Sequence, residues 1–137
     1  MGVFGWSIVI VGAAAALVLG IGYWLLTSGA LLTPLAQLEA KYKRADSRFA
    51  AFDGLRVHYL DSEPDAGAER PVAVLLHASF MDLTGWDGLA AALAPTHRVL
   101  RLDFVGHGLS GSETGGKNMF VLNEELVDRL TRQLGID

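Results

Sequence analysis

Charged residues are missing from the first part of this chain, and cysteine is missing from all of it. No Asp, Glu, Lys or Arg occurs from Met1 to Leu38, whereas all 11 basic and 15 acidic residues follow that point. The absence of cysteine excludes a disulfide framework but is compatible with an oxidising or a reducing compartment. The net charge of −4 provides no basic footprint for nucleic acid, so we expect no nucleic-acid partner.

The uncharged segment predicts a membrane-spanning helix. Residues 3–26 are almost entirely apolar, and this run exceeds the roughly 20 residues that a helix needs to cross a bilayer. Trp6 lies near one end of the run and the pair Tyr23-Trp24 near the other, at a helical separation of about 27 Å, as interfacial aromatic residues do. We therefore expect residues 3–26 to contact the lipid bilayer as a single-pass anchor.

A cleaved signal peptide is the alternative interpretation of this segment. It is disfavoured because no Lys or Arg precedes the apolar run, the run is long, and no convincing Ala-x-Ala cleavage site follows. The predicted organisation is a transmembrane helix over residues 1–28, a juxtamembrane linker over 29–46 and a soluble part over 47–137. Residues 35–45, which follow Pro34, fit either a short interfacial helix or a simple spacer.

Two further features of the anchor concern its partner and its orientation. Gly12, Ala16 and Gly20 form a small-x-x-x-small ladder that suits a weak dimer, although such residues are also common in membrane spans generally. Lys41, Lys43, Arg44 and Arg48 follow the span, and only the α-amino group precedes it. By the positive-inside rule, we expect the soluble part to be cytoplasmic.

The soluble part has the pattern of an α/β protein. Asp53-Gly54 separates two short strand-like runs and favours a hairpin, which should lie at a sheet edge, with residues 55–60 alternating as in a half-buried strand. Residues 72–76 are continuously apolar, as in a central parallel strand, and 98–103 form the next strand. Residues 86–93 and 119–134 predict helices, with Gly135 as the second helix's C-cap.

The order of these elements and their turns resembles the N-terminal part of the α/β-hydrolase fold family. The resemblance covers residues 47–137 and lies nearest to the branch of esterases, epoxide hydrolases and haloalkane dehalogenases. The residues that carry it are Asp53-Gly54, Val57-His58-Tyr59, Val74-Leu75-Leu76-His77-Ala78-Ser79, Trp86, Arg98-Val99, Asp103, Gly106-His107-Gly108 and Ser110. Fold resemblance alone does not fix a reaction.

The resemblance implies half of an oxyanion hole in the turn after the strand that ends at His77. In this family a backbone N–H of that turn helps to bind the oxyanion, and the second donor follows the nucleophile. We carry this role over to Ser79, with Phe80 as the neighbouring candidate. Ala78 stands where the family usually has Gly, so a positive φ at this position would strain the turn.

Other residues of the two turns are expected to act structurally. The family's residues that match His77 and His107 shape turns, and Asp103, Gly106 and Gly108 fit the same role. Ser110 does not match a nucleophile elbow, because Ser112 stands where Gly-x-Ser-x-Gly requires glycine and no strand immediately precedes it.

The sequence therefore predicts a membrane-anchored hydrolase that cleaves an ester or related bond by nucleophilic catalysis. The chain ends where the family's nucleophile elbow would follow, so a Ser or Asp nucleophile, the acid and the catalytic His are expected outside it. We expect the 137-residue chain alone to be inactive and to need no cofactor or metal; a small-molecule substrate belongs to the full-length protein. A non-catalytic anchored binding module remains the alternative.

Overall fold

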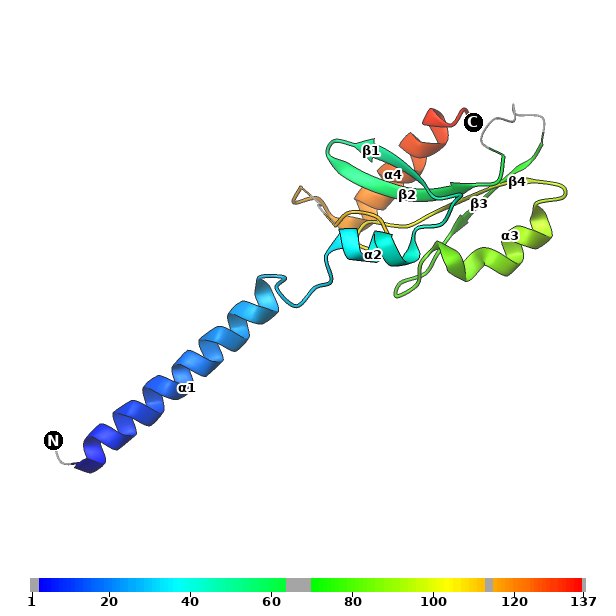
Figure 1. Ribbon diagram of the computed structural model, residues 1–137. Helices are drawn as coiled ribbons and strands as arrows, with labels where there is room; N and C mark the ends of the chain where they lie inside the picture. Colours follow the sequence, from blue (N-terminus) through cyan, green and yellow to red (C-terminus); the bar gives the residue numbers. More distant parts are fainter. Residues whose placement is uncertain (1–2, 64–69, 113–114, 137) are drawn as a thin grey trace. The chain divides into compact units, whose positions relative to one another are not determined.

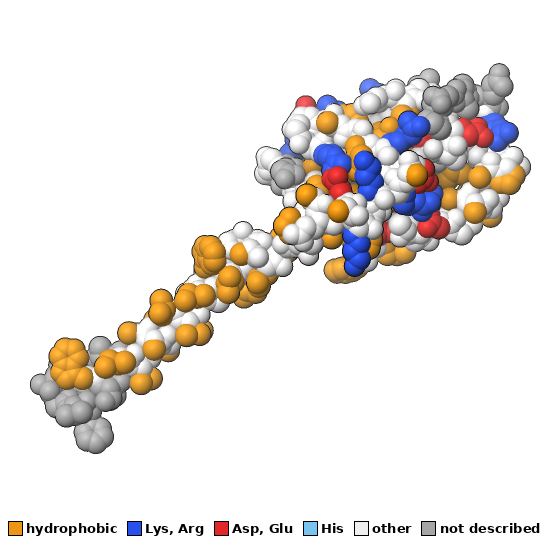
Figure 2. Space-filling view, in the orientation of Figure 1, with side chains coloured by type: hydrophobic (Ala, Val, Ile, Leu, Met, Phe, Trp, Pro, Cys, Tyr) orange, Lys and Arg blue, Asp and Glu red, His pale blue; other side chains and the backbone are white. Residues whose placement is uncertain are grey.

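The computed structural model describes residues 3–63, 70–112 and 115–136, which divide into two compact units, Met1–Pro34 and Leu35–Asp137. The linker expected at 29–46 is thus shared between the units. The first unit is dominated by α1 (Val3–Thr27), a helix of 25 residues and about 37 Å (Figure 1). Apolar side chains lie along the face of α1 that Figure 2 shows, and the stretch Ile10–Thr27 is long and apolar enough to cross a membrane. The helix follows the predicted boundaries closely; its placement in a bilayer stays a prediction.

The second unit is built on a four-stranded mixed sheet with the order β1-β2-β4-β3. The strands are β1 (Arg48–Phe52), β2 (Leu55–Asp61), β3 (Val72–Leu76) and β4 (Arg98–Leu102). β1 pairs with β2 and β2 with β4 in antiparallel orientation, whereas β3 and β4 are parallel. This arrangement confirms the predicted α/β class (Figure 1).

The hairpin between β1 and β2 forms at the predicted turn. Asp53 and Gly54 both have positive φ, 51° and 83°, as a type I′ turn requires, and Phe52 faces Leu55 in the register. β1 is the edge strand that the sequence predicts. The expectation of a half-buried β2 is wrong, because β2 lies between two strands and both of its faces are largely buried.

The apolar core lies between the sheet and α4 (Met119–Gln133). Leu122, Leu126 and Leu130 bring three successive turns of α4 against the sheet residues Val57 and Leu100. The Asn118 side chain caps the helix by accepting the Phe120 N–H at 2.9 Å, and Gly135 ends it with a φ of 64°. The predicted helix and its glycine cap are both confirmed.

The helix between β3 and β4 begins earlier than the sequence predicts. A 3₁₀ turn, η1 (Leu83–Trp86), leads into α3 (Asp87–Leu93), and the Asp82 carboxylate caps η1 by accepting the Thr84 N–H at 2.8 Å. α2 (Leu35–Tyr42) is a short helix that belongs to the same unit. Of the expected surface loop 62–71, residues 64–69 lie outside the described residues.

β3 presents the open apolar edge that is expected when a central strand lacks its second neighbour. Within the described chain it is an edge strand, paired only with β4, and its residues are half-buried, with Leu76 40% exposed. A continuously apolar sequence is typical of a parallel strand that is buried on both faces. The described elements leave β3 only half-buried. An uncharged edge of this kind is open to pairing with another strand.

Candidate functional site

The turn that follows β3 holds the predicted oxyanion-hole residues. The Met81 N–H donates to the Ala78 carbonyl at 3.2 Å, which closes a β-turn with Ser79 and Phe80 at its two central positions. Among the described residues, no acceptor contacts the N–H of Ser79 or of Phe80. The Phe80 side chain is fully exposed. The turn thus presents two backbone donors at the carboxyl end of β3.

The strain in this turn lies at Phe80 and not at Ala78. Phe80 has a φ of 64°, whereas Ala78 is not among the residues with positive φ. A left-handed conformation costs a non-glycine residue about 1–2 kcal/mol. Ala78 in place of the family's glycine therefore brings no positive-φ strain to this turn.

His77 fixes the turn after β3 to the turn after β4. Its Nδ1 donates to the Ala78 carbonyl at 2.9 Å, and its Nε2 accepts the Phe104 N–H at 3.0 Å. The ring also packs against those of Phe104 and His107. His107 in turn donates from Nδ1 to the Val105 carbonyl at 3.0 Å. Both histidines are engaged as turn-formers, the role that the sequence predicts.

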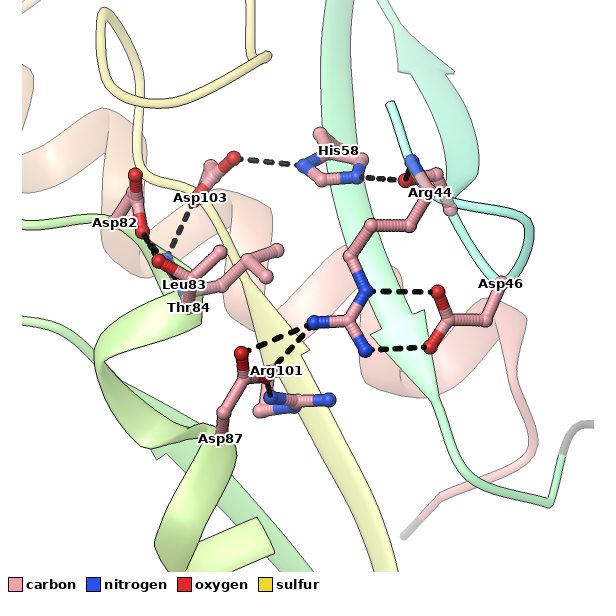
Figure 3. Close-up of polar contacts among 10 residues, drawn as sticks. Arg44, Asp46, His58, Asp82, Leu83, Thr84, Asp87, Arg101 and Asp103 are labelled. Atoms are coloured by element: carbon pink, nitrogen blue, oxygen red, sulfur yellow. Dashed lines mark hydrogen bonds and ion pairs between the residues drawn. The ribbon is translucent and has the colours of Figure 1, made fainter. Parts of the chain in front are cut away.

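A buried carboxylate, Asp103, is the hub of the surrounding structure. It accepts the Leu83 N–H at 2.8 Å and the Leu109 N–H at 2.9 Å, and contacts His58 Nδ1 at 2.7 Å. Carboxylate bonds of this kind are among the stronger hydrogen bonds of proteins. Asp103 thereby joins η1, the turn after β4 and strand β2 (Figure 3).

His58 is a structural residue that the sequence did not single out. It is only 3% exposed, and its Nε2 contacts the Ser47 Oγ at 2.8 Å while Nδ1 faces Asp103. Ser47 Oγ also accepts the Arg44 N–H at 3.0 Å, so the contacts run from the end of the linker to the hub (Figure 3). Nothing local to the sequence signals the partners of His58.

Ser110 is held as a structural residue. Its Oγ donates to the Asp103 carbonyl at 2.7 Å and accepts the His58 N–H at 2.9 Å, and the residue is buried. The hydroxyl has no access to a substrate in this arrangement. This agrees with the rejection of Ser110 as a nucleophile.

Four charged side chains form a network beside this hub (Figure 3). Arg44 pairs with Asp46 at 3.0 Å and with Asp87 at 2.9 Å, and Arg101 donates to Asp87 at 2.5 Å. The hydrogen bond from Arg101, helped by Arg44, lowers the pKa of Asp87 despite partial desolvation. Burial opposes the charge of Arg44, but its bonds to Asp46 and Asp87 prevail and raise its pKa. The network fastens the linker to α3 and β4.

An open apolar groove adjoins the β3 turn. It has a volume of about 980 Å³ and is lined by Leu76, Ala78, Ser79 and Phe104 together with the first turns of α4, including Met119 and Phe120. Across residues 3–63, 70–112 and 115–136, no group of three or more His, Cys, Asp or Glu side chains is placed to hold a metal ion.

Comparison with known proteins identifies the fold. No protein-family model matches the chain. The mesoderm-specific transcript homolog protein of Bos taurus is 31% identical over 97 residues, which are 68% of this chain and 28% of that protein. The chain therefore spans less than a third of the length of the curated relatives that it matches.

Solved structures give the same result. A hydrolase from Pseudomonas aeruginosa is 31% identical, with a TM-score of 0.57 over 68% of this chain and 34% of its own. A membrane phospholipase A, described as a bacterial virulence factor, is 22% identical, with a TM-score of 0.57 over 98% of this chain and 41% of its own. A thioesterase domain, a haloalkane dehalogenase and an epoxide hydrolase share the fold at lower than 25% identity. The sheet and helices of this chain thus have the fold of the N-terminal part of an α/β-hydrolase.

Proposed function

We propose that this chain is the N-terminal part of a membrane-anchored hydrolase that cleaves an ester or related bond by nucleophilic catalysis. The observation that carries the proposal is the β3 turn, where the N–H groups of Ser79 and Phe80 have no acceptor among the described residues. The hydrolase fold of the surrounding sheet supports it. Ser79 is the first candidate for the oxyanion-hole donor, and Phe80 is the second.

The chemistry requires a donor that is fixed before the reaction begins. Attack on a carbonyl places negative charge on its oxygen, and a backbone N–H about 3 Å away stabilises that charge without reorganising. Loss of one such donor typically lowers the rate by a factor of about 10² to 10³. His77 and Asp103 act as positioning residues, because they hold both sides of the turn. The nucleophile, Ser or Asp, and its acid and His partners are expected outside residues 1–137.

The oxyanion role can be tested by a substitution that removes one backbone N–H donor without reshaping the turn. Ser79 occupies the second position of the β-turn, where proline is well tolerated, and proline has no N–H. In the native-length protein, we expect Ser79→Pro to lower kcat for ester hydrolysis by about 10² to 10³. The matched control Ser79→Ala keeps the N–H and should retain kcat within about threefold.

Equal rates for these two variants would contradict the role of Ser79. Folding of both variants is checked by the dispersion of their amide resonances, so that a misfolded turn is not mistaken for a lost donor. If both variants keep full activity, the Phe80 N–H becomes the donor to test.

The membrane anchor is the second part of the proposal. α1 has the length and composition of a span, and the alignment with the membrane phospholipase A includes it, since it covers 98% of this chain. The basic residues Lys41, Lys43, Arg44 and Arg48 support a cytoplasmic location of the second unit. A weak dimer through Gly12, Ala16 and Gly20 is compatible with such a helix.

A non-catalytic, anchored binding module is the competing function. The observation that favours it is the lack of an acceptable nucleophile elbow anywhere in residues 1–137. A fluorophosphonate probe separates the two for a serine enzyme, because it labels an activated serine and leaves a binding module unmodified. A Gly-x-Asp motif in the corresponding downstream position would instead indicate a dehalogenase or epoxide hydrolase.

A further inference from the structure

The acidic side chains of α2 and the turn after it are neutralised within the second unit. Glu39 forms an ion pair with Arg56 of β2, and Asp46 pairs with Arg44 at 3.0 Å. Each of these two pairs is neutral overall, which, within the described part of the chain, leaves Lys41 and Lys43 as the unpaired charges of α2 and the turn after it.

Lys41 and Lys43 are the cations that remain. Both are exposed, and no described carboxylate forms an ion pair with either of them. Their ammonium groups lie instead near aromatic rings, Lys41 at 5.0 Å from the centre of Tyr42 and Lys43 at 5.6 Å from that of Phe49. A cation held this way keeps its charge and its hydrogen-bond donors available.

The two faces of α2 differ in a way that suits a membrane surface. Leu35, Leu38 and Glu39 are the half-buried residues, whereas Ala40, Lys41 and the rest of the helix are exposed. The exposed face carries no acidic residue, and Tyr42, 56% exposed, adds an aromatic ring of the interfacial type. Basic side chains are visible over this region of the second unit (Figure 2).

The chain also keeps α2 close to any membrane that α1 enters. Only seven residues separate Thr27, where α1 ends, from Leu35, where α2 begins. Fully extended, they reach about 25 Å. Because this linker is short, Lys41 and Lys43 are held at a high effective concentration near the lipid headgroups.

We propose that α2 and the turn after it bind anionic lipid headgroups through Lys41 and Lys43, and so dock the second unit on the membrane surface. The proposal rests on the membrane anchorage of α1 but concerns a separate contact. A lysine near an anionic surface contributes about fivefold to such an equilibrium, so the two together contribute about 30-fold.

The experiment uses the full chain in lipid nanodiscs. Since the chain has no cysteine, Ala40→Cys on the exposed face of α2 gives a unique site for an environment-sensitive NBD fluorophore. We expect a blue shift in nanodiscs that contain phosphatidylglycerol, and none in phosphatidylcholine alone. Raising salt from about 0.1 to 1 M shortens the Debye length from about 10 to 3 Å and should abolish the shift.

The charge-removal variants decide the outcome. K41Q/K43Q should lower the docking equilibrium about 30-fold, whereas the control K117Q/R132Q removes the same net charge from other elements and should behave like the parent. The proposal is overturned if phosphatidylglycerol causes no shift, if K41Q/K43Q keeps it, or if the control loses it equally. Failure of the chain to copurify with either kind of nanodisc would instead overturn the anchorage.

Discussion

Substitution of Gly108 by alanine tests the hub at Asp103 most sharply. Gly108 has a φ of 50°, and a Cβ at this position would overlap the Asp103 carboxylate. Gly106 lies two residues earlier in the same turn, with a φ of 72°, and a Cβ there would meet no atom within 4 Å. The two glycines share backbone strain, so they differ only in what an added methyl group displaces.

The expected costs follow from this difference. Gly106→Ala should cost about 1–2 kcal/mol for the left-handed conformation alone. Gly108→Ala adds the displacement of Asp103 from the N–H groups of Leu83 and Leu109 and from His58. Hydrogen bonds to a charged group contribute about 1.5–3 kcal/mol each, so the loss of even one of these bonds brings the total, with the strain, to about 2.5–5 kcal/mol. A domain of this size has only about 5–15 kcal/mol of stability in all.

Both variants are measured in the native-length protein in mild detergent, by thermal unfolding followed in near-UV circular dichroism. Gly106→Ala should unfold cooperatively at a lower temperature than the parent, and Gly108→Ala at a lower temperature still. Hydrogen exchange in the turn 103–111 provides a second measurement. Free energies of unfolding within about 1 kcal/mol of each other would refute the role given to Asp103.

Four further outcomes are expected. The intact chain in detergent should not hydrolyse a short-chain nitrophenyl ester, and turnover that Ser110→Ala abolishes would contradict this. It should also resist carbonate extraction from membranes, while deletion of residues 1–38 should release it; recovery of the intact chain in the soluble fraction would rule out an integral span. Residues 47–137 alone should aggregate or remain molten, because β3 is an open apolar edge; a monomeric fragment with dispersed amide resonances would show this to be wrong. The pKa of Asp87 is lowered, so its pairing stabilises the fold at pH values above the ordinary carboxyl pKa. This stabilisation should be lost as the pH falls through the lowered pKa, below about 4. Arg101→Gln should raise the pKa of Asp87 in an NMR titration, and an unchanged pKa would refute the pairing.

Features set by local sequence were predictable. The positive φ values of the hairpin follow from Asp53-Gly54, and the buried stripe of α4 follows from leucines four residues apart. Each depends on neighbours within one turn of chain. The hydrolase fold was likewise accessible, because several such local patterns occur in one order.

Features set by distant partners were not predictable. The burial of His58 depends on Asp103, 45 residues away. In the β3 turn the sequence directed attention to Ala78, but the sign of φ is decided by which residue occupies the third position of the turn, and that residue is Phe80.

We propose that residues 1–137 belong to a membrane-anchored hydrolase whose β3 turn binds the oxyanion. The most direct test isolates the native protein from its membranes with an antibody against the second unit, treats it with a fluorophosphonate and locates the adduct by mass spectrometry. For a serine enzyme, we expect the label on the serine of a Gly-x-Ser-x-Gly motif outside residues 1–137. An adduct on Ser79 or Ser110, or an unlabelled native chain whose downstream sequence contains neither Gly-x-Ser-x-Gly nor Gly-x-Asp, would contradict it.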